Sequence, residues 1–182
     1  MRDHSKIGRL SQAVGEHFES WVDGQNEMAM RLGIIAHVEK NEPHSKVIGG
    51  QLRHTAAGVA DRTGTLEGGR TLAVECKSTS EKRFAKAEVS KRQAEHLDAV
   101  ARAGALALLL VEFRLTTAPF YKRYAIPWLE TPWRTLRTAE SLDPADIEQW
   151  RIAPDTCYLS KWHAGGPRSS SHGIRNRVYA RE

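Results

Sequence analysis

The run Ala-Leu-Ala-Leu-Leu-Leu-Val-Glu-Phe at residues 105–113 constrains the fold more than any other part of the chain. It is almost entirely apolar and far shorter than a membrane span, so we expect a strand that is buried on both faces. Helical patterns over residues 8–32 and 87–104 supply layers to cover such a strand. The predicted fold class is therefore α/β, with a mixed central sheet flanked by helices.

Shorter apolar runs indicate the rest of the sheet. The segment 120–126 alternates and is expected to pair beside 105–113. Strands at 57–61 and 70–77 are expected to form a hairpin through a turn at Gly68-Gly69. A further strand is expected at 34–40, irregular chain at 41–56 with Pro43 and Gly49-Gly50 as breakers, and a capped helix with proline in its first turn from Asp143.

Length and charge limit the class of protein. The 182 residues suit one domain, expected at 1–163, followed by a basic tail at 164–182. The net charge of +5 favours a polyanionic partner, with nucleic acid first and an anionic membrane surface second. Because no run has the length of a membrane span or the character of a signal core, we expect a cytoplasmic protein. Cys76 and Cys157 are expected to be reduced, with one disulfide as the alternative.

Three residues on the predicted hairpin are candidates for catalysis. Strand alternation turns Cys76 toward the core and lets Glu75 and Lys77 emerge together, while Asp61 ends the neighbouring arm. Two carboxylates suit a hard divalent cation such as Mg²⁺. An ammonium group beside them can orient water or stabilise charge on phosphorus. The alternative is an ordinary solvated strand end, since short motifs of this kind are common.

The helices add polar residues at the border of their apolar stripes or within them. Glu19 borders the first stripe, and Gln93 and His96 lie on the second. Glu19 is either a solvated side chain or part of a metal site, and Gln93 and His96 are either satisfied polar side chains of the core or parts of a site. Basic residues near these segments are candidate contacts to DNA phosphates, with a solvated surface as the alternative: Lys82, Arg83, Lys86, Lys91 and Arg92.

Taken together, these residues resemble the PD-(D/E)xK nuclease superfamily, and within it the RecU-like Holliday junction resolvases. The resemblance extends over about residues 14–127 and rests on motifs that occur in the family order. They are Gly15-x-x-Phe18-Glu19, Ala-Asp-Arg-Thr-Gly at 60–64, the glycine turn, Val-Glu-Cys-Lys-Ser-Thr at 74–79, Val-Ser-Lys-Arg-Gln-Ala-Glu-His-Leu at 89–97, and the two strands that follow.

The resemblance implies an endodeoxyribonuclease that depends on Mg²⁺, which Mn²⁺ is expected to replace, and that uses no nucleotide cofactor. Family members are homodimers that nick two opposite strands of a four-way DNA junction. Asp61, Glu75 and the backbone carbonyl of Cys76 would bind the metal ion. Glu19 would assist at the metal site, Lys77 would position or activate water, and Gln93 would hold an active-site contact.

The chain departs from the family pattern at two places. Cys76 stands where the family has alanine, a small apolar replacement. The segment 41–56 is shorter than the stalk of RecU proteins, and its Lys46 and Arg53 are candidate DNA contacts. It is expected to form a protruding loop or a short stalk, and the alternative is a phage-type or archaeal-like variant that opens the junction in another way. The alternatives are a repair or restriction-type nuclease on duplex or flap DNA and a catalytically silent DNA-binding module.

Overall fold

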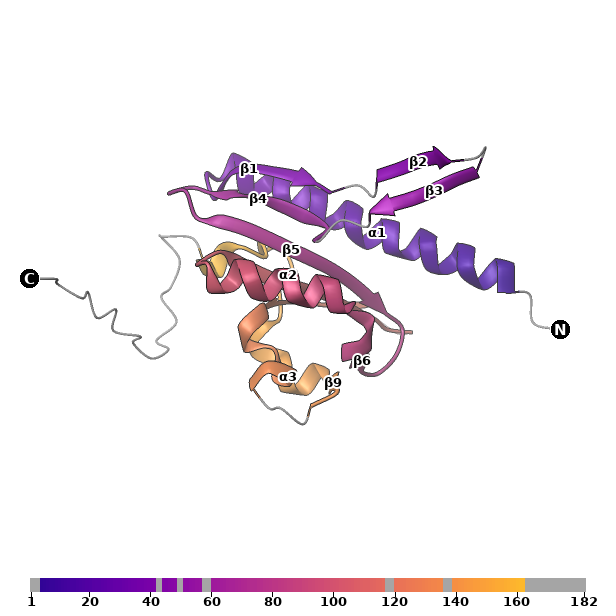
Figure 1. Cartoon of the computed structure of the whole chain (residues 1–182). Helices are drawn as coiled ribbons and strands as arrows, with labels where there is room; N and C mark the ends of the chain where they lie inside the picture. Colours follow the sequence, from indigo (N-terminus) through magenta and orange to yellow (C-terminus); the bar gives the residue numbers. More distant parts are fainter. Residues whose placement is uncertain are drawn as a thin grey trace, which may run out of the picture.

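A computed structural model describes residues 4–41, 44–48, 51–56, 60–116, 120–135 and 139–162, and only the backbone of 4–16, 44–48 and 51–56. Its centre is a five-stranded sheet in the order β1-β4-β5-β7-β8 (Figure 1). β5 and β7 are parallel and the other neighbours are antiparallel, so the predicted mixed sheet is confirmed. The strands are β1 Ile35–Lys40, β4 Arg62–Leu66, β5 Thr71–Thr79, β7 Leu106–Arg114 and β8 Tyr121–Pro127.

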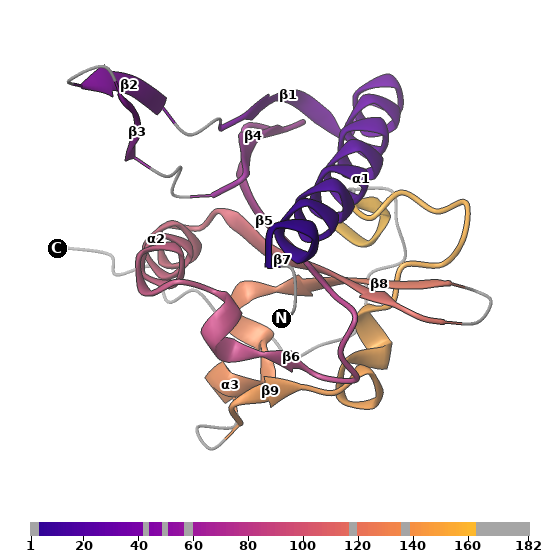
Figure 2. The same ribbon diagram turned by 90° about the vertical axis from the view of Figure 1, so that its right-hand side faces the viewer.

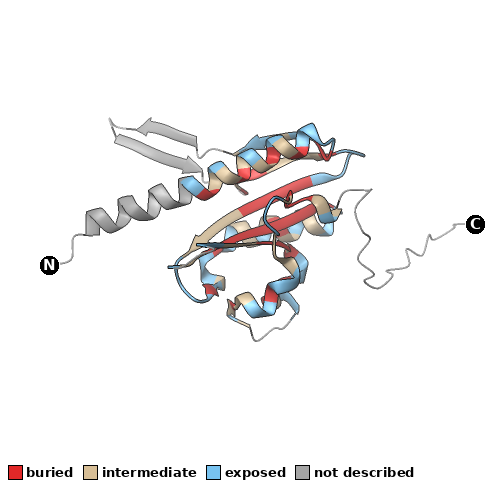
Figure 3. Cartoon of the chain, turned by 180° about the vertical axis from the view of Figure 1, so that it is seen from behind, coloured by how far each residue is buried: buried red, intermediate tan, exposed pale blue. Residues whose placement is uncertain are grey.

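One long helix covers each face of this sheet (Figure 2). Phe18 and Val22 of α1 (His4–Arg31) pack against β5, β7 and β8, and Gly33 ends the helix with a positive φ of 64°. Leu97 of α2 (Lys91–Arg102) packs on the opposite face. β7 is buried along nearly its whole length, as its apolar run predicts (Figure 3).

Short elements complete the layer around α2. They pack Phe84, Trp128, Trp133, Leu142 and Ile147 into the same core. The helix expected from Asp143 is a 3₁₀ helix, and the Asp143 carboxylate caps it by accepting a hydrogen bond from the Ala145 backbone N–H. The elements are β6 Phe84–Ala85, η1 Lys86–Glu88, η2 Trp128–Glu130, α3 Pro132–Thr135, β9 Ser141–Leu142, η3 Pro144–Trp150 and, after the chain returns toward α1, η4 Ser160–Trp162.

The β4–β5 hairpin differs in one respect from the expected one. Its turn has Gly68 and Gly69 at φ of 87° and 86°, as predicted. The first arm, however, begins at Arg62, whereas the sequence predicts a strand at 57–61, of which 57–59 lie outside the described residues. The start of β4 at Arg62 is explained by tertiary contacts. Arg62 is buried against carboxylates of α1, and a Cβ on Gly64 would lie 2.3 Å from the His37 carbonyl oxygen of β1.

The expectation of irregular chain at 41–56 is wrong. β2 (His44–Ile48) and β3 (Gln51–Ala56) form an antiparallel hairpin in which Lys46 lies opposite Arg53. The Gly49-Gly50 pair, expected to be a breaker, has the two-residue spacing typical of a hairpin connection. The hairpin belongs to its own two-stranded sheet and extends beyond the ends of β1 and β4 (Figures 1 and 2).

The cysteines and the helices bear on two further expectations. Cys76 and Cys157 are free thiols, so the alternative of a disulfide between them does not apply. Within the described ranges, no helix combines the length and the apolar character needed to cross a membrane. The expected tail at 164–182 lies outside the described residues.

Candidate active site

The second half of β5 brings the predicted catalytic group together. β4 and β5 pair so that Arg62 lies opposite Val74, which places Asp61 beside the next residues of β5. The Asp61 carboxylate accepts a hydrogen bond of 2.7 Å from the backbone N–H of Cys76. The Lys77 ammonium lies 2.9 Å from Glu75 Oε1. Alternation along β5 thus has the predicted result, with Glu75 and Lys77 on one face.

The two oxygens of Glu75 have different surroundings. The residue is completely buried, and Oε1 accepts hydrogen bonds from Lys77 and from the side-chain amide of Gln93. Oε2 is also buried and has no hydrogen-bond partner among the described residues. Buried carboxylate oxygens normally have a partner, because desolvation of an unpaired charge is costly. A group that binds this oxygen would therefore complete the site.

Burial shifts the protonation equilibria of both carboxyl groups. Burial, reinforced by the nearby charge of Asp61, raises the pKa of Glu75 to about 7, although Lys77 opposes the shift. Burial also raises the pKa of Asp61, and the hydrogen bond from Cys76 opposes that shift. Two neighbouring carboxylates that are both hard to ionise are favourable ligands for a cation, which would offset their mutual repulsion.

The donor atoms fit a magnesium ion. Mg²⁺ prefers oxygen ligands and keeps several of its waters, so one or two carboxylates are enough to hold it. Asp61, Glu75 and the Cys76 carbonyl are oxygen donors of this kind. In the described part of the chain, no group of three or more His, Cys, Asp and Glu side chains is arranged to hold a metal ion. The carboxylate pair would therefore act with backbone, water and substrate oxygens.

Glu19 is connected to this site through basic residues. Its carboxylate lies 2.9 Å from Lys40 Nζ and 3.5 Å from Arg62 Nη2. Arg62, almost fully buried, also donates to Asp23 at 2.8 Å and to the backbone carbonyl of Asp61 at 3.0 Å. In this arrangement the Glu19 carboxylate is paired with two cations, and Arg62 links it to the backbone of Asp61.

Gln93 joins α2 to the site. Its backbone N–H donates to Ser90 Oγ at 3.3 Å, and its side-chain oxygen accepts from the Ser90 N–H at 3.0 Å, which is a capping box. The other end of the same amide donates to Glu75. These hydrogen bonds explain why Gln93, a polar residue, occupies a position on the apolar stripe of α2. His96, one turn further, has a buried Nε2 with no hydrogen-bond partner in the described ranges, and burial lowers its pKa.

The predicted DNA contacts fall into three groups. Arg83, Lys86 and Lys91 form ion pairs with Asp143, Glu140 and Glu95, at 2.8, 3.3 and 3.8 Å. Lys82 and Arg92 are exposed and have no ion pair with any described residue. Lys46 and Arg53 face each other across the β2–β3 hairpin, and their side chains lie outside the described part of the structure.

A second polar cluster was not predicted from the sequence. Glu112 of β7 is completely buried, and its Oε2 lies 2.8 Å from both Nε and Nη2 of Arg123 on β8. Ser78, which follows Lys77 directly, donates to Glu112 Oε1 at 3.3 Å. A signal was available, because a glutamate within a strand buried on both faces requires a cationic partner. The alternation in 120–126 did not show that Arg123 is that partner.

The raised pKa of Glu75 predicts how stability depends on pH without metal. Glu75 has a folded pKa of about 7, against an ordinary 4.5, so its contribution to the free energy of unfolding is fully present below about pH 4.5. That contribution falls by about 3 kcal/mol as the pH rises to 7. We expect Glu75→Gln to be more stable than the parent at pH 8 and equal to it at pH 4.5. Urea unfolding at both pH values measures this difference in stability.

Mg²⁺ should raise the Tm of the parent at pH 8 and leave the Tm of Glu75→Gln unchanged. Equal increases in Tm for the two proteins would argue against Glu75 as a metal ligand.

Comparison with known proteins identifies a family whose model matches this chain. The family model of RecU, described as recombination protein U, matches residues 33–152. A comparison with curated proteins found no match. Among solved structures, Hjc of Archaeoglobus fulgidus, a Holliday junction resolvase from an archaeal hyperthermophile, is 19% identical, with a TM-score of 0.45 over 78% of this chain and 92% of that chain. The matched residues of the family model include the whole sheet from β1 to β8.

Proposed function

Because the chain belongs to the RecU family of Holliday junction resolvases, we propose that Asp61, Glu75 and Lys77 form its nuclease active site and that this site works with Mg²⁺. The observation that carries the proposal is Glu75, a completely buried carboxylate beside Asp61 and Lys77 whose Oε2 has no partner among the described residues. The Cys76 carbonyl would add a further oxygen ligand, and Mn²⁺ is expected to substitute for Mg²⁺.

The reaction is hydrolysis of a phosphodiester, in which water attacks phosphorus and the bond to the leaving oxygen breaks. A bound Mg²⁺ would polarise the phosphate and lower the pKa of water. The side chains of the chain hold the reacting groups. Lys77 Nζ is placed to orient the attacking water or to donate to a phosphate oxygen. Gln93 and the Cys76 N–H hold the carboxylates of Glu75 and Asp61 in position. Glu19 would assist through Arg62.

The substrate and assembly follow from the same proposal. A four-way junction has two equivalent strands to cut, so a two-fold homodimer would supply two active sites. DNA phosphates would contact exposed cations near the site, and the β2–β3 hairpin would act as a short stalk toward the junction centre. The proposal also includes a nuclease domain at 1–163 and a basic tail at 164–182. The protein would act in the cytoplasm of a bacterial or phage-infected cell. Residues proposed to contact DNA are Lys46, Arg53, Lys82, Arg83, Lys86, Lys91 and Arg92.

One cleavage experiment tests this function. The protein is incubated with Mg²⁺ and either a synthetic four-way junction or a linear duplex that contains the same arm sequences. Paired symmetric nicks in the junction, with the duplex left intact, are the expected result. Equal cutting of the duplex would indicate a repair or restriction-type nuclease instead. Binding without any metal-dependent cleavage would indicate a silent DNA-binding module.

A further inference from the structure

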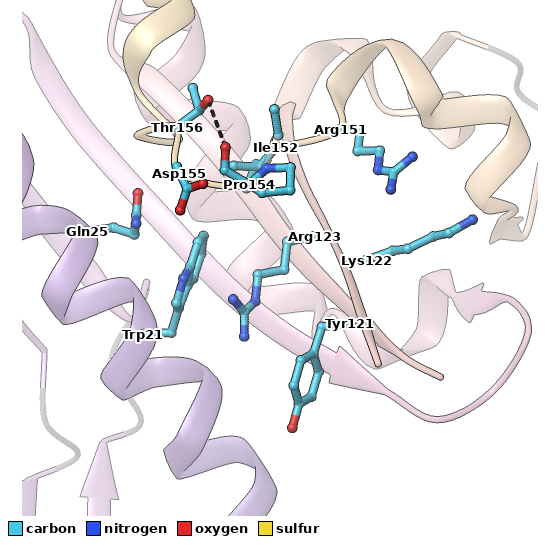
Figure 4. Close-up of a pocket in the computed structure, with 11 residues that line it drawn as sticks. Trp21, Gln25, Tyr121, Lys122, Arg123, Arg151, Ile152, Pro154, Asp155 and Thr156 are labelled. Carbon is cyan, nitrogen blue, oxygen red and sulfur yellow. Dashed lines mark hydrogen bonds between the residues drawn. The ribbon is translucent and has the colours of Figure 1, made fainter. Parts of the chain in front are cut away.

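A cleft of about 350 Å³ lies at the outer edge of β8, between α1 and the loop 151–156 (Figure 4). We call it the β8 cleft. β8 is the edge strand of the sheet, and its first residues, Tyr121 to Arg123, line the cleft with Trp21 of α1 and with Arg151. None of these residues belongs to the carboxylate site on β5, so the cleft needs an explanation of its own.

Arg123 is held rigidly at the inner side of the cleft. Glu112 binds two of its nitrogens, Nε and Nη2, from within the sheet. The rings of Trp21 and Tyr121 lie near the guanidinium, with centroids 4.2 and 5.1 Å from its central carbon (Figure 4). Nη1 has no hydrogen-bond partner among the described residues. The arrangement fixes a guanidinium with donors to spare, as recognition of a phosphate requires.

Further cations lie along the cleft. Lys122 has no ion pair within the described ranges; it alternates with Arg123 along β8, so its ammonium extends away from the Arg123 guanidinium, toward the side of Arg151 (Figure 4). Arg114, opposite Tyr121 in the ladder, shares the face of Glu112 by strand alternation, and its buried Nε has no partner among the described residues. Arg151 is paired with Glu148 at 2.8 Å. Asp155 is the single carboxylate among the residues that line the cleft, and Glu112 and Glu148 lie outside the lining and pair with Arg123 and Arg151. The donors left for an anion are therefore Lys122 and Nη1 of Arg123.

The ladder relates the cleft to the active site. Ser78 of β5 lies opposite Glu112, and Glu112 lies opposite Arg123, so the cleft and Lys77 belong to the same end of the sheet. The cleft and Lys77 lie on opposite faces of the sheet. Lys77 points to the α2 side with Gln93, whereas Arg123 points to the α1 side with Trp21. The N-terminal half of α1 extends beyond this end of the sheet (Figure 1), so DNA that reaches both faces there would run beside it.

From this placement we propose that the β8 cleft binds the phosphate backbone of a DNA arm other than the arm whose strand is cut. The inference rests on the proposed function, because a junction offers a second arm and a linear duplex does not. One phosphate would accept a hydrogen bond from Arg123 Nη1, and Lys122, which projects from the other side of β8, would contact a separate phosphate, without any reading of base sequence. The cleft would thereby favour junctions over single arms.

Binding measurements with a non-cutting protein test the proposal. In the Asp61→Asn background, with Mg²⁺ replaced by Ca²⁺, Lys122→Gln should weaken junction binding about three- to tenfold and lower the salt slope by about 0.9. Lys122→Glu should weaken it further. Binding to a linear duplex of one arm should change less than twofold. The matched control is Arg31→Gln, which removes one exposed cation at the far end of α1. Thermal unfolding checks that each variant folds.

Two results would overturn the proposal. One is a junction affinity and salt slope for Lys122→Glu that equal those of Arg31→Gln. The other is an equal loss of affinity for junction and linear duplex, because the cleft would then contact the arm that is cut. Because only binding is measured here, the two failures can be told apart. A parent protein that cuts no junction would disprove the proposed function, while the Lys122 effect would still show that the cleft binds a DNA arm.

Discussion

Replacement of Asp61 by asparagine is expected to lower junction cleavage about 10³-fold or more, while junction binding changes less than threefold. Asparagine has nearly the same shape, and its side-chain oxygen can still accept the hydrogen bond from the Cys76 N–H. It lacks the negative charge that would bind a metal ion. Metal ions contribute several kcal/mol to the stabilisation of such transition states, and about 4 kcal/mol corresponds to this loss of rate. Single-turnover cleavage with saturating protein measures it.

A matched control separates this effect from a general loss of acidic charge. Glu81 lies on the exposed loop that follows β5, so Glu81→Gln should cut at the parental rate. The Asp61→Asn protein should also show a lower pKa for Glu75, because Asp61 contributes to raising it. That change is measurable by the pH dependence of unfolding. Metal-dependent cleavage by Asp61→Asn within tenfold of the parent would rule out the proposed carboxylate pair.

The second large effect concerns stability. Glu112→Gln should lower the free energy of unfolding by about 3 to 5 kcal/mol, because it leaves the mostly buried Arg123 without its counter-charge. Glutamine retains the size of glutamate, so a cavity does not explain the loss. The same substitution should also weaken the bond to Ser78, next to Lys77, and thereby reduce cleavage in the protein that remains folded. Urea unfolding at neutral pH measures the loss in the free energy of unfolding.

A double variant identifies the cause. When Arg123→Met is combined with Glu112→Gln, the unpaired buried charge is gone, and the double variant should be more stable than Glu112→Gln alone. Glu140→Gln is the exposed control, because its ion pair with Lys86 lies at the surface and is worth about 0.5 kcal/mol or less. A double variant whose loss equals the sum of the two single losses would show that no buried pair couples them.

Much of the site could be derived from local patterns. The period of two along 70–77 is enough to separate Glu75 and Lys77 from Cys76, and the glycine turn brings the preceding arm back beside them. These features depend on neighbours along the chain and on one hairpin. The start of β4 could not be derived in this way, because it depends on Arg62 meeting Asp23 and Glu19 of α1.

The polar residues on helices show the same limit. The sequence placed Gln93 on an apolar stripe without a partner, and the partner is Glu75, 18 positions away in the chain. Glu19 was expected to assist at the metal site, and its direct contacts are Lys40 and Arg62. The family resemblance predicted that these residues matter. Which atoms they contact depends on how the helices lie against the sheet.

The order of elements, the buried central strand and the shared face of Glu75 and Lys77 all follow from the local period of apolar and polar residues in the chain. Three other features come from packing: Glu75 Oε2 is buried without a partner among the described residues, Glu112 pairs with Arg123, and a cleft opens at the edge of β8. These features depend on distances between atoms of separate elements, which packing sets and which no local pattern contains.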